Sequence, residues 1–332
     1  MKSTIPAVAA VLTVGLAAAA CGSSDTPTAA AAGGGASSAG GATTTLNIAY
    51  VPYNGNAPMF LGVKQGLYAK EGLELKMTPA QAPAAAIAGL VSGQQQLAFT
   101  TVVTLVTARS QGTDVKCVTP VDGVVDDAEK ALSTATMVKG DSSVQDAAGL
   151  AGKKVGVVAL GSQNHLFTLE KADQAGIDPT SVQVVQLPFP QMQAALEQGR
   201  VDAVVATAPF TGQIQAAGGR VLNWPEAELN KGGNGTCFAA TDKYLASNAA
   251  DVQKFITANA AAIDYAKAHE DEARAVIPTF LEVTPEQAKT AVTGVVYDPT
   301  LNTDSIDKFQ QLMLKHGFIK QALPLDQLVY QP

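Results

Sequence analysis

Hydrophobic and polar positions alternate along residues 46–224 in short blocks of two kinds. Apolar runs such as LNIAYV (46–51) and VDAVVA (201–206) are typical of buried strands. Between such runs, apolar residues recur at helical spacing, as in APMFLGVKQ (57–65), which predicts amphipathic helices. Because strands separated by helices of this length pair in the same direction, the pattern predicts an α/β fold built on parallel strands.

The same criteria predict the order of the elements. We expect strands at 46–51, 73–77, 97–100, 115–121, 153–158, 182–187, 201–206 and 220–224, and helices at 57–65, 84–92, 101–110, 164–175, 191–198 and from Pro209. After Asn230 a strand enters a helix within 235–245, and from Asp251 onward the pattern is mostly helical. TPEQ (284–287) fits a capping box at the start of one of these helices.

Two segments in different halves of the chain follow the same plan of helix, glycine, polar pair, apolar strand and threonine. Gly93 and Thr101 stand eight residues apart, as do Gly199 and Thr207. Ordinary α/β sequences produce such echoes as well. Two modest lobes and one large domain are therefore both open at this point.

The first residues predict export. Lys2 precedes an apolar run from Ile5 to Ala20, which is short for a membrane span and ends in small residues before Cys21. This pattern resembles a bacterial lipoprotein signal over 1–20, with Cys21 as the lipidated residue; an ordinary secretory signal cut nearby is the alternative. We therefore expect a protein held by its lipid on the extracytoplasmic face of the cell membrane.

Residues 21–45 follow the signal and differ sharply in composition from the rest. They are almost wholly Ala, Gly, Ser, Thr and Pro, with Asp25 as the only charge, and predict a flexible linker. Without Lys2, 21 basic residues face 29 acidic ones, a net charge of −8. This balance argues against a nucleic-acid partner.

Two cysteines, Cys117 and Cys237, remain beyond Cys21. Outside the cytoplasm such a pair forms a disulfide more often than a metal site, which needs more ligands at closer spacing. Two buried free thiols are the alternative.

A longer series of segments carries a family resemblance. In order these are AYVPYNGNAPMFLGVKQGLYAKEGLEL, AGLVSGQQQLAFTT, TARSQGTDVKCV, LAGKKVGVV and AGIDPTSVQVVQLPFPQMQAALEQGRVDAVVATAPF. Over residues 46–270 the chain resembles the solute-binding lipoproteins of ABC importers. The branch is the NMT1/THI5-like one, which takes up nitrate, sulfonates, taurine and thiamine-precursor pyrimidines.

The resemblance implies a two-lobed periplasmic-binding-protein fold of type II, in which two strands cross between the lobes as a hinge. Lobe 1 would be 46–135 plus 240–332 and lobe 2 would be 140–235, with the crossings near ATMVKG and GTCFAA. The second crossing would bring Cys237 beside Cys117, so a bridge becomes sterically reasonable. The resemblance also implies a monomer that uses no cofactor, meets the membrane through its lipid only, and delivers a small solute to permease subunits served by a cytoplasmic ATPase.

In open α/β sheets, ligands bind beyond the carboxyl ends of the strands, where helix N-termini can hold an anionic oxygen. Small, hydroxyl and amide side chains gather at four such places. Each of them could instead have a purely structural role, as a helix cap, a turn residue or a core residue. Asp122 in PVDG is either a turn former or, facing the cleft, a partner for a ligand amine. The expected ligand-binding residues are Tyr53, Asn54, Asn56, Thr100, Thr101, Asp122, Gly161, Ser162, Gln163, Asn164, Phe189, Thr207 and Phe210.

His165 raises the question of catalysis. VVALGSQNHL contains no Gly-x-Ser-x-Gly and no nearby cysteine, while His269 and His316 lie in distant helical segments. We therefore expect no catalytic residue and no metal site. Two rivals remain: a lipoprotein that senses a ligand without transport, and a pyrimidine-synthase-like enzyme, whose family shares the fold but carries a cysteine cluster and no export signal.

Overall fold

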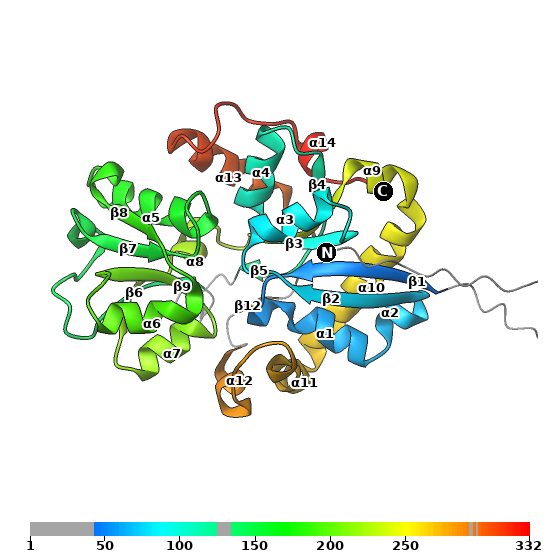
Figure 1. Ribbon diagram of the computed structural model, residues 1–332, viewed down its shortest axis with the longest axis horizontal. Coiled ribbons are helices and arrows are strands. Elements are labelled where there is room, and N and C mark those ends of the chain that lie inside the picture. The colour runs from blue at the N-terminus through cyan, green and yellow to red at the C-terminus, as the bar shows by residue number, and fades with distance from the viewer. Residues whose placement is uncertain (1–42, 125–133, 292–294, 297) are drawn as a thin grey trace, which may run out of the picture. The chain divides into compact units, whose positions relative to one another are not determined.

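Two five-stranded sheets organise the computed structural model, which describes residues 43–124, 134–291, 295–296 and 298–332 (Figure 1). The first sheet has the order β2-β1-β3-β11-β4. Its strands are β1 (Thr44–Tyr50), β2 (Leu73–Pro79), β3 (Leu97–Thr101), β4 (Val115–Pro120) and β11 (Thr236–Thr241). The second has the order β10-β6-β9-β7-β8. Its strands are β6 (Thr134–Val138), β7 (Lys154–Val157), β8 (Gln183–Gln186), β9 (Ala203–Thr207) and β10 (Arg220–Asn223).

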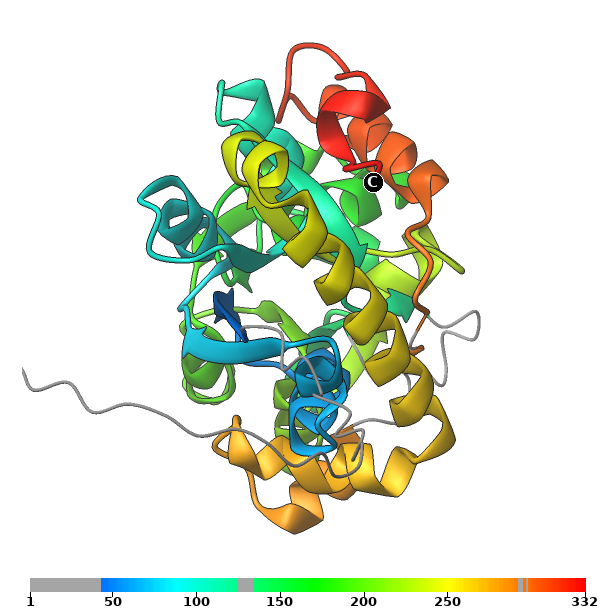
Figure 2. The ribbon, with the colours of Figure 1, turned by 90° about the vertical axis from the view of Figure 1, so that its right-hand side faces the viewer.

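Each sheet together with its helices is called a lobe below. The helices of the first lobe are α1 (Ala57–Lys64), α2 (Leu67–Lys70), α3 (Pro83–Val91), α4 (Val102–Ser110), α9 (Asp242–Ser247), α10 (Ala249–Ala268), α11 (Glu270–Val276), α12 (Pro285–Ala291), α13 (Thr303–Lys315) and α14 (Leu325–Leu328). Figure 2 shows the long helix α10 running across this lobe. The helices of the second lobe are α5 (Gln163–Gln174), α6 (Phe189–Glu197), α7 (Phe210–Ala216) and α8 (Pro225–Leu229). Short β5 (Gly123–Val124) pairs with β12 (Val295–Val296).

The predicted α/β fold with two lobes is confirmed, but the expectation of parallel strands holds only in part. β1 pairs in parallel with β2 and β3, and β7 pairs in parallel with β8 and β9. β11 runs antiparallel to β3 and β4, and β6 runs antiparallel to β9 and β10. These exceptions arise because β6 follows the passage into the second lobe and β11 the passage back. The periodicity of the sequence carries no information on that direction.

The predicted crossing segments overlap these two strands. β6 lies wholly in the second sheet, including Thr134 and Ala135, which the resemblance placed in lobe 1. β11 lies wholly in the first sheet.

Local signals account for several helix ends. Thr284 and Gln287 form the predicted capping box, with Thr284 N–H donating to Gln287 Oε1 at 2.8 Å and Gln287 N–H to Thr284 Oγ1 at 3.2 Å. Gly176 ends α5 with φ +76°, a left-handed conformation that suits glycine. The five-residue helix α8 was not predicted.

A disulfide and an apolar contact fix parts of the fold that matter for the site. Cys117 on β4 and Cys237 on β11 form a disulfide with their Cα atoms 5.7 Å apart. Leu166 and Phe167 of α5, in the second lobe, are buried together with Ile306 and Phe309 of α13, in the first. The lobes are therefore joined by a packed contact as well as by the chain crossings. Within the described residues no helix is both long and apolar enough to cross a membrane.

Candidate functional site

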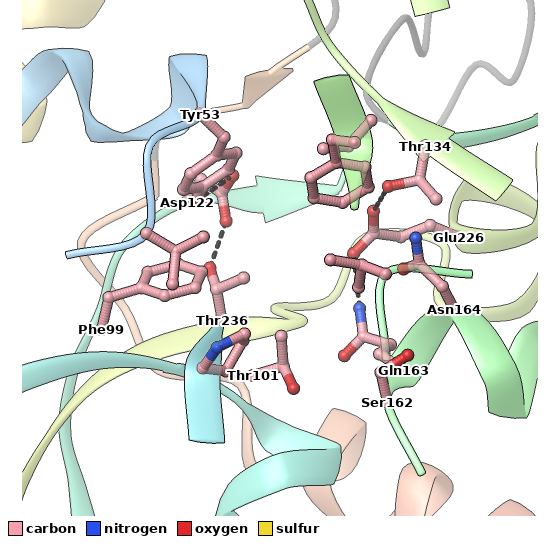
Figure 3. Close-up of a pocket in the computed structure, with 15 residues that line it drawn as sticks. Tyr53, Phe99, Thr101, Asp122, Thr134, Ser162, Gln163, Asn164, Glu226 and Thr236 are labelled. Atoms are coloured by element: carbon pink, nitrogen blue, oxygen red, sulfur yellow. Dashed lines mark hydrogen bonds between the residues drawn. The ribbon is translucent and has the colours of Figure 1, made fainter. Parts of the chain in front are cut away.

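A cavity of about 80 Å³ lies between the two lobes and takes its walls from both (Figure 3). The first lobe contributes Val51, Tyr53, Pro83, Phe99, Thr101, Asp122 and Thr236. The second contributes Thr134, Val158, Ser162, Gln163, Asn164, Phe189, Thr207 and Glu226. A cavity of roughly 150 Å³ holds a benzene molecule. The volume in this state therefore suits a small polar group, and a larger solute needs the lobes to part.

The strand and helix ends named by the sequence position several of these side chains. Thr101 ends β3 and Thr207 ends β9, so the two copies of the repeated glycine-to-threonine plan bring their threonines to the same cavity. Thr101 caps α4 by accepting the N–H of Thr104, and Ser162 caps α5 by accepting the N–H of His165.

Asp122 is the acidic group of the first wall. It follows β4, and its carboxylate accepts hydrogen bonds from Tyr53 Oη at 2.9 Å and from Thr236 Oγ1. Burial raises the pKa of Asp122 from 3.8 to about 6, and the two hydroxyl donors act in the opposite direction by stabilising the charged form.

Glu226 is the acidic group of the second wall and lies on α8. Its carboxylate accepts from Thr134 Oγ1 at 2.6 Å and from Gln163 Nε2 at 3.0 Å. Burial, helped by the charge of Asp122, raises the pKa of Glu226 from 4.5 to about 7, while the hydrogen bonds from Thr134 and Gln163 act in the opposite direction. Figure 3 shows the two carboxylates on opposite sides of the cavity. Neither forms an ion pair with any residue in the described ranges.

Most side-chain donors of the walls are used within the walls themselves. The hydroxyl protons of Tyr53, Thr134 and Thr236 go to the two carboxylates. Thr101 donates to Thr104 Oγ1 at 3.0 Å, and the Asn164 amide donates to the carbonyl oxygen of Val205 at 2.9 Å.

Acceptors remain among the residues that line the cavity. Gln163 is only 5% exposed, and its Oε1 has no hydrogen-bond partner in the described structure. No lysine, arginine or histidine of the described residues lines the cavity. The site is therefore rich in acceptors and carries two acidic groups.

Aromatic rings form the apolar part of the walls. Tyr53 and Phe99 lie tilted against each other with ring centroids 5.2 Å apart. Phe189 stacks on Phe210 at 5.5 Å with an interplanar angle of 16°, and of these two rings only Phe189 lines the cavity. Aromatic rings can interact with apolar or cationic groups.

The structure brings eight of the thirteen predicted site residues to the cavity: Tyr53, Thr101, Asp122, Ser162, Gln163, Asn164, Phe189 and Thr207. Five do not line it: Asn54, Asn56, Thr100, Gly161 and Phe210. Asn54 and Asn56 are buried in the turn before α1, where Asn56 Nδ2 donates to the carbonyl oxygens of Val51 and Tyr53. Thr100 donates to the carbonyl oxygen of Thr101, and Gly161 forms an exposed turn with φ +75°.

Several lining residues escaped the sequence prediction, and Glu226 is the most important. It sits in WPEAEL, where proline followed by two glutamates is typical of a first helical turn. That signal marks a helix but not the cavity. Thr134, Thr236 and Phe99 are ordinary strand residues whose meeting depends on pairings between distant segments.

His165 lies outside the cavity. Its Nδ1 accepts the backbone N–H of Gly161 at 3.0 Å, and its ring contacts Phe318 with centroids 5.2 Å apart. Burial and the charge of His316 lower the pKa of His165. Among the described residues, no group of three or more His, Cys, Asp or Glu side chains is arranged to hold a metal ion.

Comparison with protein families gives one match. The model of the NMT1/THI5-like family matches residues 54–273, which is most of the chain. No curated protein matches the sequence.

Solved structures share the fold at low sequence identity. The alkanesulfonate-binding protein SsuA of Xanthomonas axonopodis pv. citri, bound to MOPS, superposes with a TM-score of 0.73 and 16% identity, covering 87% of this chain and 99% of its own. The CA3427 gene product of Candida albicans, described as having the generic periplasmic binding protein fold, superposes with a TM-score of 0.71 and 19% identity. The match covers 86% of this chain and 96% of the other. The desulfurization enzyme DSZB superposes with a TM-score of 0.61 and 16% identity, covering 85% of this chain and 96% of its own. The fold is thus that of periplasmic binding proteins, and it also occurs in an enzyme.

Proposed function

Because the chain belongs to the NMT1/THI5-like family, we propose that it is the solute-binding protein of an ABC importer. It captures one small polar solute between its lobes, closes on it by bending at the chain crossings, and delivers it to the permease subunits. The resemblance offers sulfonates, taurine, nitrate-like anions and aminopyrimidines as candidate solutes.

One observation carries this proposal: the cavity lies between the lobes and is walled by polar side chains from both. Thr101 and Asp122 stand on one side, with Ser162, Gln163 and Glu226 on the other. A solute that touches both walls is buried only when the lobes are together. Its binding therefore favours the closed state, which is the form a permease can recognise.

The walls support binding rather than catalysis. Both described cysteines are joined in the disulfide, and His165 packs against Phe318 and does not line the cavity. Neither arrangement leaves an activated nucleophile with a base at the solute. We therefore propose no enzymatic step, although DSZB shares the fold.

The attachment to the membrane is a separate part of the proposal. Cys21, the signal 1–20 and most of the linker lie outside the described residues. We propose lipidation of Cys21 and a position on the extracytoplasmic face, supported by the sequence pattern. Mass spectrometry of the mature protein tests this, since an unmodified residue at position 21 would contradict it.

Solute capture can be tested without knowing the solute. The purified full chain is incubated with a metabolite extract, washed, and weighed by native mass spectrometry. We expect one added small molecule per chain with the unchanged protein and none with Ser162→Trp, which places an indole in the cavity. A protein that carries no added mass under any extract would contradict the proposal.

A further inference from the structure

Two carboxylates lie on opposite sides of a cavity to which the described residues contribute no cationic side chain. From this arrangement we infer that the solute carries an ammonium or amidinium group whose N–H donors bridge Asp122 and Glu226. The inference rests on the proposed function and names the substrate class of that same cavity.

Each carboxylate has free capacity for such a ligand. Asp122 accepts from Tyr53 and Thr236, and Glu226 accepts from Thr134 and Gln163, one donor to each oxygen. A carboxylate oxygen has two lone pairs, so every one of these four oxygens can accept a further hydrogen bond. The existing donors hold the carboxylates in place, and the cation supplies the missing charge.

Gln163 points to the same chemistry independently. Its Nε2 donates to Glu226 Oε1, which fixes the orientation of the Gln163 amide. The Oε1 atom of Gln163 itself is then left as an acceptor. The side chain is 5% exposed, and Oε1 is buried without a partner. A buried acceptor of this kind needs a donor, and Gln163 is one of the residues that line the cavity. A ligand N–H satisfies it, whereas an anion cannot.

An anionic solute meets the opposite conditions. The described lining contains no positively charged side chain, and the hydroxyls of Tyr53, Thr134 and Thr236 already donate to the carboxylates. At the starts of α4 and α5, Thr101 and Ser162 accept one first-turn N–H each. The partial charge of a helix end is about half an elementary charge, so two carboxylates outweigh it.

The position of the carboxylates also links the ligand to closure. Asp122 belongs to the first lobe and Glu226 to the second, so their like charges oppose the approach of the empty lobes. A cation between them removes that repulsion and is attracted by both. Tyr53, Phe99 and Phe189 add ring faces that favour a cation with an apolar body.

The test uses probes of equal shape and different charge. Benzamidinium, benzamide and benzoate form one set, and acetamidinium, acetamide and acetate form a smaller one. Binding to the full chain is measured by calorimetry at constant ionic strength. We expect the cation of at least one set to bind more tightly than its neutral counterpart, and both anions to fail.

Charge-removing variants make the result specific. Asp122→Asn and Glu226→Gln keep the shape of each side chain, and each should weaken the cation about tenfold or more while leaving the neutral probe nearly unchanged. Glu197→Gln, an exposed change at the end of α6, should alter neither value. The ratio of the two dissociation constants is read within one variant, so partial unfolding cannot imitate the effect.

Two outcomes separate this inference from the proposed function. Tight binding of benzoate, acetate or nitrate in the cavity, blocked by Ser162→Trp, would overturn the inference that the solute is a cation. It would leave the solute-binding proposal intact. An absence of any captured solute in the native mass spectra would overturn the proposed function itself.

Discussion

Replacing Glu226 with glutamine should stabilise the empty protein at neutral to alkaline pH while weakening its affinity for a cationic solute. In the folded state the carboxylate is nine-tenths buried, and burial raises its pKa from 4.5 to about 7. That difference corresponds to roughly 3 kcal/mol of unfavourable free energy for the charged form. Glutamine has no charge to bury.

The sign of the pH dependence follows from the direction of the shift. Between the ordinary pKa and the raised one, the folded state binds more protons than the unfolded state. The free energy of unfolding therefore falls as pH rises from about 4.5 to about 7, and stays reduced above it. Asp122 and Tyr53 face the same cavity, and the raised pKa of Asp122, about 6, adds a slope of the same sign.

The hydrogen bonds of the glutamine variant can be kept. Its oxygen accepts from Gln163 as before, and its new amide donates to Thr134 Oγ1, whose hydroxyl turns to act as acceptor. The expected gain in unfolding free energy is therefore about 2–3 kcal/mol at pH values well above 7, shrinking toward zero near pH 4.5.

Urea unfolding at several pH values measures this gain, with Glu197→Gln as the exposed control and calorimetry of benzamidinium alongside. A variant that is less stable than the unchanged protein at high pH would refute the reasoning. So would a gain that is the same at every pH. The distinctive result is a rise in stability together with a fall in affinity. If the role of Glu226 were merely structural, its replacement would lower both.

Three further predictions concern other parts of the chain. Ser162→Trp should abolish solute capture while leaving the protein folded, at a cost of about 1 kcal/mol for the lost cap and about 1–3 kcal/mol for the crowded indole, as shown by calorimetry beside urea unfolding; unchanged affinity would contradict it. Removing the disulfide with Cys117→Ala and Cys237→Ala together should cost about 2–5 kcal/mol, and a peptide map run without reductant that finds two free thiols would overturn the bridge. Burial alone would raise the pKa of Glu170, but hydrogen bonds from Lys315 and His316 lower it below its ordinary value. Glu170→Gln should therefore lower the free energy of unfolding by about 2 kcal/mol above pH 5, and this difference should vanish as pH falls through the lowered pKa. Equal stability of the two proteins in urea at neutral pH would argue against a stabilising role for the contacts of Glu170 with Lys315 and His316.

The alternation of short apolar runs with helical stretches was enough to predict the α/β fold, because central strands such as β6 and β9 are buried on both faces and helices bury only one. The capping box at Thr284 and the turn at Gly176 were predictable for a different reason, because their hydrogen bonds and backbone angles depend on neighbours in sequence. The direction of β6 and β11 was not, because it depends on where the chain passes between lobes.

The site divides along the same line. Residues at strand ends that begin a helix, such as Thr101 and Ser162, were predictable from their position alone. Glu226 was not, because α8 is too short for a periodic pattern and reaches the cavity through contacts with Thr134 and Gln163, both distant in sequence. The sequence foresaw a ligand amine only for the case that Asp122 faces the cleft. The second carboxylate and the unpaired Gln163 oxygen are what turn that condition into a charge preference.

A solute held between the two walls should draw the lobes together. Ser92, on the first lobe, and Leu160, on the second, are exposed on either side of a groove next to the cavity. Spin labels on cysteines at these two positions, with Cys21 replaced by serine, report their separation by pulsed electron resonance. We expect a shorter and narrower distance distribution when a captured solute or benzamidinium is added, and no change in Ser162→Trp. A distribution that is identical with and without bound solute would contradict it.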